Sequence, residues 1–243
     1  MPHAAFAARK VDLMDAALII ETFFRLMDAL PLTLEVWIFS VLIGAVLATG
    51  LTWMRVSGPK PLALISRGYV FVFRGTPLLI QLFIIYFGLS SFSFIRDSFV
   101  WPMLRDPLFC AVLSLALCTA AYSSEIFRGA LASVPKDQIE AARACGISGL
   151  TLFRRIILPI ASRHALPPYS NEVISMTKAT ALVSLVTLWD MMSVALKVRN
   201  DTLVTYTPLI VAGAIYFGLN FLIARAFMAA EYCLSAHLRP RTH

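Results

Sequence analysis

The sequence predicts an all-α integral membrane protein with five transmembrane helices. Of its 243 residues, 59% are hydrophobic and only 14% are charged, and the mean hydropathy is +0.77. A soluble protein of this length does not need so large an apolar fraction to build its core. The apolar residues also gather in stretches of about 20 residues or more, the length of helix that crosses the hydrocarbon of a bilayer.

The predicted spans are separated by short polar turns. They lie near residues 31–54, 68–95, 107–130, 166–189 and 205–228. The stretch before them, residues 13–29, carries Asp15, Glu21, Arg25 and Asp28 through an apolar pattern. This mixture is typical of a helix that lies at the membrane interface rather than one that crosses the membrane.

The loop over residues 131–160 predicts two short helices outside the bilayer. Pro135 suits the first turn of a helix, and Gly146 can supply the left-handed residue that ends it. Ser148 is a candidate N-cap for a second helix, which Pro159 is expected to end before the next span. Such a hairpin offers a surface to a partner; an ordinary amphipathic connector is the alternative.

The basic residues are divided unevenly between the two sides of the predicted bundle. If the 131–160 loop is inside, thirteen Lys and Arg residues fall on the cytoplasmic side and seven outside. Basic loops resist translocation, so this division favours an N-terminus outside and a C-terminus inside.

The same loop resembles a known signature. Its order of Glu-Ala-Ala, three residues, Gly, nine residues, Ile, one residue and Leu-Pro resembles the cytoplasmic signature of permease subunits in bacterial ATP-binding cassette (ABC) importers. The resemblance implies the type I importer fold, the bacterial inner membrane, and a coupling helix that sits in a cleft of an ATPase subunit. The ATPase-coupling residues that it implies are Glu140, Ala141, Ala142, Gly146, Ile156, Leu158 and Pro159.

The second predicted span contains polar residues that are expensive in lipid. Arg74 and Gln81 should face protein or water, and Thr76 followed by Pro77 predicts a helix start or a break. This segment resembles the Arg-Gly-Thr-Pro region of the polar amino-acid branch of these permeases. The resemblance implies a polar, basic amino acid or a derivative such as an opine as the transported molecule. Arg74 could serve the translocation cavity or snorkel to the cytoplasmic interface.

The fourth predicted span carries a polar face. Asn171, Ser175 and Lys178 follow at i, i+4 and i+7, and Glu172 lies about a quarter turn away. A Lys near the bilayer centre costs roughly 2.5 to 3.5 kcal/mol, so Lys178 should face a water-filled cavity or a carboxylate. A structural ion pair with a neighbouring subunit is the alternative to a role in transport.

Glu125 and Glu172 are the acidic candidates for contact with a cationic substrate. For Glu125 a local pair with Arg128, three residues later on the same helix, is the simpler account. The full set of candidate translocation-pathway residues is Arg74, Thr76, Gln81, Glu125, Asn171, Glu172, Ser175 and Lys178.

Several classes of function find no support in the sequence. There is no GxxxxGK[ST] loop for ATP, and no Ser-His-Asp or HExxH arrangement for hydrolysis. The four cysteines show no CxxC spacing, so we expect no metal site. The basic residues are scattered in short loops, which does not favour nucleic-acid binding. We therefore expect neither a catalytic site nor a bound cofactor in this chain.

Two functions remain from the sequence. The first is a permease subunit, with a periplasmic segment over residues 1–29, a transmembrane domain over 30–230 and a cytoplasmic tail over 231–243. Its partners would be two ATPase subunits that bind ATP and Mg²⁺, a second permease, identical or homologous, a periplasmic solute-binding protein and the lipid bilayer. The alternative is a self-contained secondary transporter or channel. No inverted repeat is visible, and five spans do not divide into two equal repeats.

Overall fold

The computed structural model describes residues 16–234, which form helices joined by short turns and contain no strand. The predicted all-α class is confirmed. The long helices are α1 (Ala16–Val56), α2 (Lys60–Gly75), α6 (Pro107–Ala132), α9 (Leu158–Ala179) and α11 (Tyr206–Leu234). The shorter segments are α3 (Leu78–Phe83), η1 (Ile84–Gly88), η2 (Leu89–Ser91), α4 (Ser93–Arg96), α5 (Trp101–Leu104), α7 (Lys136–Ala144), α8 (Gly149–Leu152), η3 (Phe153–Ile157), η4 (Thr180–Leu185) and α10 (Met191–Thr202).

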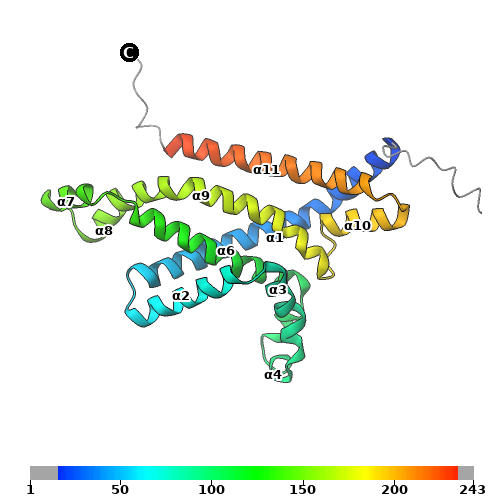
Figure 1. Ribbon diagram of the computed structural model, residues 1–243, viewed down its shortest axis with the longest axis horizontal. Coiled ribbons are helices and arrows are strands. Elements are labelled where there is room, and N and C mark those ends of the chain that lie inside the picture. The colour runs from blue at the N-terminus through cyan, green and yellow to red at the C-terminus, as the bar shows by residue number, and fades with distance from the viewer. Residues whose placement is uncertain (1–15, 235–243) are drawn as a thin grey trace, which may run out of the picture.

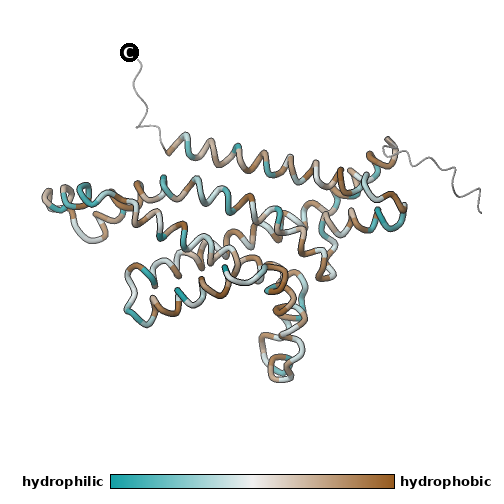
Figure 2. Tube along the Cα trace, viewed as in Figure 1, coloured by the Kyte–Doolittle hydropathy of each residue, from teal (hydrophilic) through white to brown (hydrophobic). Residues whose placement is uncertain are grey.

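The long helices lie roughly along one axis. Figure 1 shows α6 beside α1 and α9, and α11 beside α9. The turn between α1 and α2, the α7–α8 segment and the end of α11 lie toward one end of the bundle. The start of α1 and α10 lie toward the other end. Figure 2 shows hydrophobic residues along α1 and α11, whereas α7 is largely hydrophilic.

Helix α1 is longer than predicted because it continues through Pro31. A proline inside a helix removes one backbone hydrogen bond. Here the buried residues of α1 recur every three or four positions on both sides of Pro31, from Thr22 to Thr52, while Pro31 itself is exposed. Packing along this unbroken stripe outweighs the lost bond. Residues 16–29 are therefore joined to the first span, whereas the sequence predicted a separate helix; their place at the interface stays a prediction.

The second predicted span, residues 68–95, is not one helix. Helices α2 and α3 are separated by Thr76 and Pro77, and the chain bends by 104° there. The break predicted at Thr76 is confirmed, but the straight span through it is wrong. After the bend the chain leaves the bundle through short helical turns, as Figure 1 shows for α3 and α4.

Helix α6 confirms the third predicted span and lies at the centre of the bundle. Half of its 26 residues are buried, and most of these have small side chains, which lets neighbouring helices approach closely. Ser40 of α1 donates a hydrogen bond to the carbonyl of Val112 (3.3 Å), and Trp37 donates to the carbonyl of Val173 in α9 (3.1 Å). These bonds hold α1 against both neighbours.

The fourth predicted span, residues 166–189, has other boundaries. Pro159 does not end a helix, because the π-helical turn η3 leads directly into α9, with Pro159 in its first turn. A π turn shifts the backbone pairing, and this accommodates a proline that cannot donate. Helix α9 ends at Ala179, and η4 follows. Asp190 then caps α10 by accepting hydrogen bonds from the backbone amides of Met192 and Ser193. Helix α10 lies between the fourth and fifth predicted spans, where the sequence predicted only a turn.

The described residues contain three helices that could cross a membrane, or four if the bent α2–α3 pair is one span. Helices α1, α6 and α11 are long and apolar enough to cross a membrane, and the bent α2–α3 pair would make a fourth. Helix α9 contains too many polar residues to be counted among these apolar helices of residues 16–234. The count of five spans therefore stays a prediction. The domain limits also stay predictions, and residues 1–15 and 235–243 of the two predicted terminal segments lie outside the described residues.

Candidate functional site

The turn between α7 and α8 is built around Gly146. Its φ of +79° is in the left-handed region, as the sequence predicted. The amide of Gly146 donates to the carbonyl of Arg143 (2.9 Å), and the amide of Ile147 donates to the carbonyl of Ala142 (3.0 Å). This pair of bonds is the Schellman ending of a helix. Ser148 has the extended backbone of an N-cap, but its side chain forms no capping bond.

One side of the 131–160 loop is anchored and the other is exposed. Ala130, Val134 and Ala161 form a buried cluster against which Ile139 and Ile157 pack, so the loop is fixed to the ends of α6 and α9. Of the predicted coupling residues, Ala142 is buried, and Ile156 and Pro159 are half-buried. Glu140, Ala141, Gly146 and Leu158 are exposed.

The exposed side of this loop is partly apolar. Leu150, four residues after Gly146, is 69% exposed, and Phe153 is 40% exposed. Exposed apolar side chains beside charged ones are typical of a surface that a second protein covers. The structure therefore places the predicted coupling residues on a segment that is anchored on one side, with Glu140, Ala141, Gly146 and Leu158 on its exposed side.

A second group of candidates meets between α2, α6 and α9. The guanidinium of Arg74 lies 5.1 Å from the ring centroid of Tyr122, and the Glu172 carboxylate accepts a hydrogen bond from Thr119 (2.9 Å). Thr119 and Tyr122 are one turn apart on α6. Each predicted charge is therefore held by a side chain of the central helix.

Thr76 and Gln81 form the break between α2 and α3. The Gln81 side-chain amide donates to the carbonyls of Phe73 (2.9 Å) and Thr76 (3.0 Å) and to the Thr76 hydroxyl (2.9 Å). Gln81 is buried, as predicted for a polar residue in this span. Its donors supply partners for carbonyls that the broken helix leaves free.

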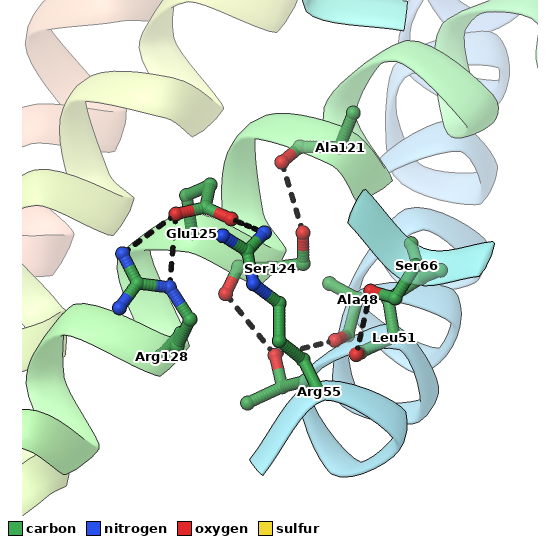
Figure 3. Close-up of polar contacts among 9 residues, drawn as sticks. Ala48, Leu51, Arg55, Ser66, Ala121, Ser124, Glu125 and Arg128 are labelled. Carbon is green, nitrogen blue, oxygen red and sulfur yellow. Dashed lines mark hydrogen bonds and ion pairs between the residues drawn. The ribbon is translucent and has the colours of Figure 1, made fainter. Parts of the chain in front are cut away.

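Glu125 lies between two arginines (Figure 3). Arg55 of α1 pairs with its Oε1, and Arg128 donates to its Oε2 through Nε (3.0 Å) and Nη2 (2.8 Å). The predicted pair with Arg128 is confirmed. Both oxygens of Glu125 are thus engaged by protein, in contrast to Glu172.

The predicted polar face of α9 is also found. Asn171, Ser175 and Lys178 are all exposed, while their neighbours Val173, Met176 and Thr177 are buried. Asn171 borders a cavity of about 200 Å³ between α9 and α11. The ion pairs formed within residues 16–234 do not include Lys178. The eight pathway candidates therefore occupy several places rather than one cavity.

Sequence reasoning missed two partners of the charged candidates. Thr119 lies within an apolar stretch of the sequence. Arg55 is 70 residues before Glu125 and belongs to a different helix. No spacing rule connects such positions. Among the described residues no three His, Cys, Asp or Glu side chains are grouped so that they could hold a metal ion.

Comparison with known proteins identifies the kind of chain that carries this loop. Residues 40–230 match the family of binding-protein-dependent transport system inner membrane components. The chain belongs to this family. It is a multi-pass membrane permease of the ABC importers, in which ATP hydrolysis belongs to separate ATPase subunits. The alternative of a self-contained secondary transporter or channel is therefore wrong.

The similarity to individual relatives extends over most of the permease sequence. It is 51% identical over 220 residues, 90% of each chain, to the octopine transport system permease protein OccM of Rhizobium radiobacter. Over 210 residues, 86% of this chain and 88% of the relative, it is 40% identical to the histidine/lysine/arginine/ornithine transport system permease protein HisM of Escherichia coli. A crystal structure of an amino acid ABC transporter with histidines has 30% identity and a TM-score of 0.79, covering 90% of this chain and 98% of that one. These permeases share the predicted type I importer fold.

Proposed function

We propose that this permease forms half of the membrane pathway of an inner-membrane importer for basic amino acids or opines. A second permease, identical or homologous, would form the other half. Two ATPase subunits would bind ATP and Mg²⁺ inside, and a periplasmic binding protein would deliver the substrate outside. The N-terminus would lie outside the cell and the C-terminus inside.

The observation that carries the proposal is the 131–160 loop, which is anchored on one side and exposed on the other. Its Schellman turn at Gly146 and its anchor on α6 and α9 suit a contact that must transmit force. Glu140, Ala141 and Leu150 stand on its exposed side and would meet an ATPase. The turn between α1 and α2 and the end of α11 lie toward the same end of the bundle (Figure 1), and this arrangement agrees with the orientation favoured by the basic residues.

The substrate class is supported by the relatives and by two charges of opposite sign. An amino acid carries a carboxylate and at least one cationic group, and Arg74 and Glu172 could each recognise one of them. Thr119 and Tyr122 hold these side chains in place. Substrate choice would be shared with the binding protein.

The proposed mechanism is alternating access. ATP binds the closed pair of ATPases better than the open pair, and only such a difference in affinity can shift the equilibrium between two conformations. Closure would displace the 131–160 loop together with the ends of α6 and α9. The pathway would then open to the binding protein outside.

The test is co-purification in mild detergent from the native membrane, comparing the tagged wild-type permease with Glu140→Lys. We expect the wild type to retain an ATPase and a second permease, and the variant to lose the ATPase but keep the permease partner. In proteoliposomes the wild-type complex should take up labelled octopine or arginine only with ATP. A wild-type chain that purifies alone and transports without ATP would refute the proposal.

A further inference from the structure

Glu125 joins two helices at the end of the bundle that carries the 131–160 loop. Arg55, which reaches Glu125 from α1, is the second-last residue of that helix, and Glu125 lies two turns before the end of α6. Beside this pair, Thr52 donates to the carbonyl of Ser124 (3.1 Å), so α1 and α6 are bonded twice within one turn (Figure 3).

The two arginines on Glu125 make different kinds of contact. Arg128 is on the same helix three residues later, and 38% of its side chain is exposed. Arg55 comes from another helix, and its side chain is only 22% exposed against 17% for Glu125. Removing Arg128 would leave the ion pair between α1 and α6 intact, whereas removing Arg55 would delete that ion pair and leave the Thr52–Ser124 bond as the polar contact beside it.

Helix α1 extends from this contact to the far end of the bundle. With 41 residues it is about 60 Å long. Close to the middle of α1 the Thr33 hydroxyl accepts a hydrogen bond from the amide of Met191 at the start of α10 (3.0 Å). In the first third of α1, Leu26 packs in a buried cluster with Met191 of α10 and Val211 of α11. A movement of α1 therefore reaches α10 and α11.

We infer that Glu125 is a positioning residue that, through Arg55, makes α1 move together with α6 when the 131–160 loop is displaced. Helices α6 and α9 both adjoin the loop, so the loop pulls them directly but reaches α1 only through the contacts of α1 with these two helices. Within residues 16–234, the Arg55–Glu125 pair is the ion pair among these contacts. This inference rests on the proposed function and assigns Glu125 to coupling instead of substrate contact.

The test compares Arg55→Gln with Arg128→Gln, since each removes one arginine from the same carboxylate. The complete transporter, purified through the tagged permease, is reconstituted in proteoliposomes, and uptake of labelled octopine or arginine is measured together with ATP hydrolysis. We expect Arg55→Gln to lower the substrate taken up per ATP at least tenfold while hydrolysis stays within twofold. Arg128→Gln should stay within twofold in both, and Arg55→Lys should recover most of the loss.

Equal ratios in the two Gln variants would overturn the inference, because the arginines would then act only by neutralising a charge. If Arg55→Gln does not assemble, Glu125→Asp replaces it. The shorter side chain withdraws from α1, and an unchanged ratio in this variant would also overturn the inference. Failure of the proposed function is distinguishable, since it would appear as absent uptake in the wild type.

Discussion

Gly44 lies where α1 packs tightly against Ala116 and Thr119 of α6. A Cβ atom added there would be 2.1 Å from Cγ2 of Thr119 and 3.2 Å from the carbonyl oxygen of Ala116. Thr119 would have to move, although its hydroxyl also donates to Glu172. This glycine therefore affects both the packing of the bundle and the position of a predicted pathway carboxylate.

We predict that Gly44→Ala lowers the free energy of unfolding by about 1–3 kcal/mol, the usual cost of overpacking. The measurement is the thermal unfolding midpoint of the purified permease in detergent. Gly50→Ala is the matched control, because Gly50 is on the same helix and its added Cβ meets nothing within 4 Å. The control should be neutral or slightly stabilised by helix propensity. An equal decrease in both variants would contradict the steric explanation.

Gln81 shows how one side chain can stabilise a break. We predict that Gln81→Leu destabilises the permease by about 1–3 kcal/mol, because the partly buried hydrogen bonds from its amide to the carbonyls of Phe73 and Thr76 are lost. Thermal unfolding in detergent measures the loss. Gln138→Leu, at an exposed position of α7, is the control and should leave the midpoint unchanged. A midpoint unchanged by Gln81→Leu would mean that the bend holds without this side chain.

At the scale of the elements, the α7–α8 turn depends on the backbone of Gly146. A β-branched residue is strained at its φ of +79°, at a cost of roughly 1–2 kcal/mol. We predict that Gly146→Val distorts the exposed loop and reduces ATP-dependent uptake at least tenfold, while the permease stays in the membrane. Radiolabelled uptake and immunoblotting of membranes check both outcomes. Gly129→Val, at a helical position with open space, should transport normally; wild-type uptake by Gly146→Val would remove the role given to this turn.

Prolines explain most of the differences between the predicted and observed elements. The sequence places breaks at Pro31, Pro77 and Pro159, but only Pro77 lies at one. At Pro31 a continuous packing stripe maintains the helix, and before Pro159 a π turn adjusts it. The first depends on packing against other helices and the second on a change of backbone pairing before the proline, so the positions of the prolines alone could not predict them. The left-handed Gly146 was predictable because its cause lies within one turn.

At the scale of the whole molecule, the polar face of α9 is incomplete without something beside it. Asn171, Ser175 and Lys178 are exposed on a chain whose helices also expose many large apolar side chains. Their one-sided arrangement was readable from helical spacing. Helical spacing does not show what lies beside this face. Among the described residues no carboxylate forms an ion pair with Lys178. We predict that α9 crosses the bilayer, and because a lysine facing lipid would be costly, we expect water or a second subunit beside this face.

We predict that Lys178→Met changes the rate of uptake, or the preference between octopine and arginine, at least tenfold, which corresponds to about 1.4 kcal/mol. The reason is that a lysine beside a water-filled pathway alters the field felt by a charged substrate without touching the 131–160 loop. Uptake in proteoliposomes measures the effect, and the amount of co-purified ATPase should equal that of the wild type. Lys136→Met, at an exposed position of α7, is the control for loss of a positive charge and should keep the same substrate preference. If Lys178→Met reduces only the amount of assembled permease pair and leaves transport per complex unchanged, Lys178 lies in the subunit contact and the pathway passes elsewhere.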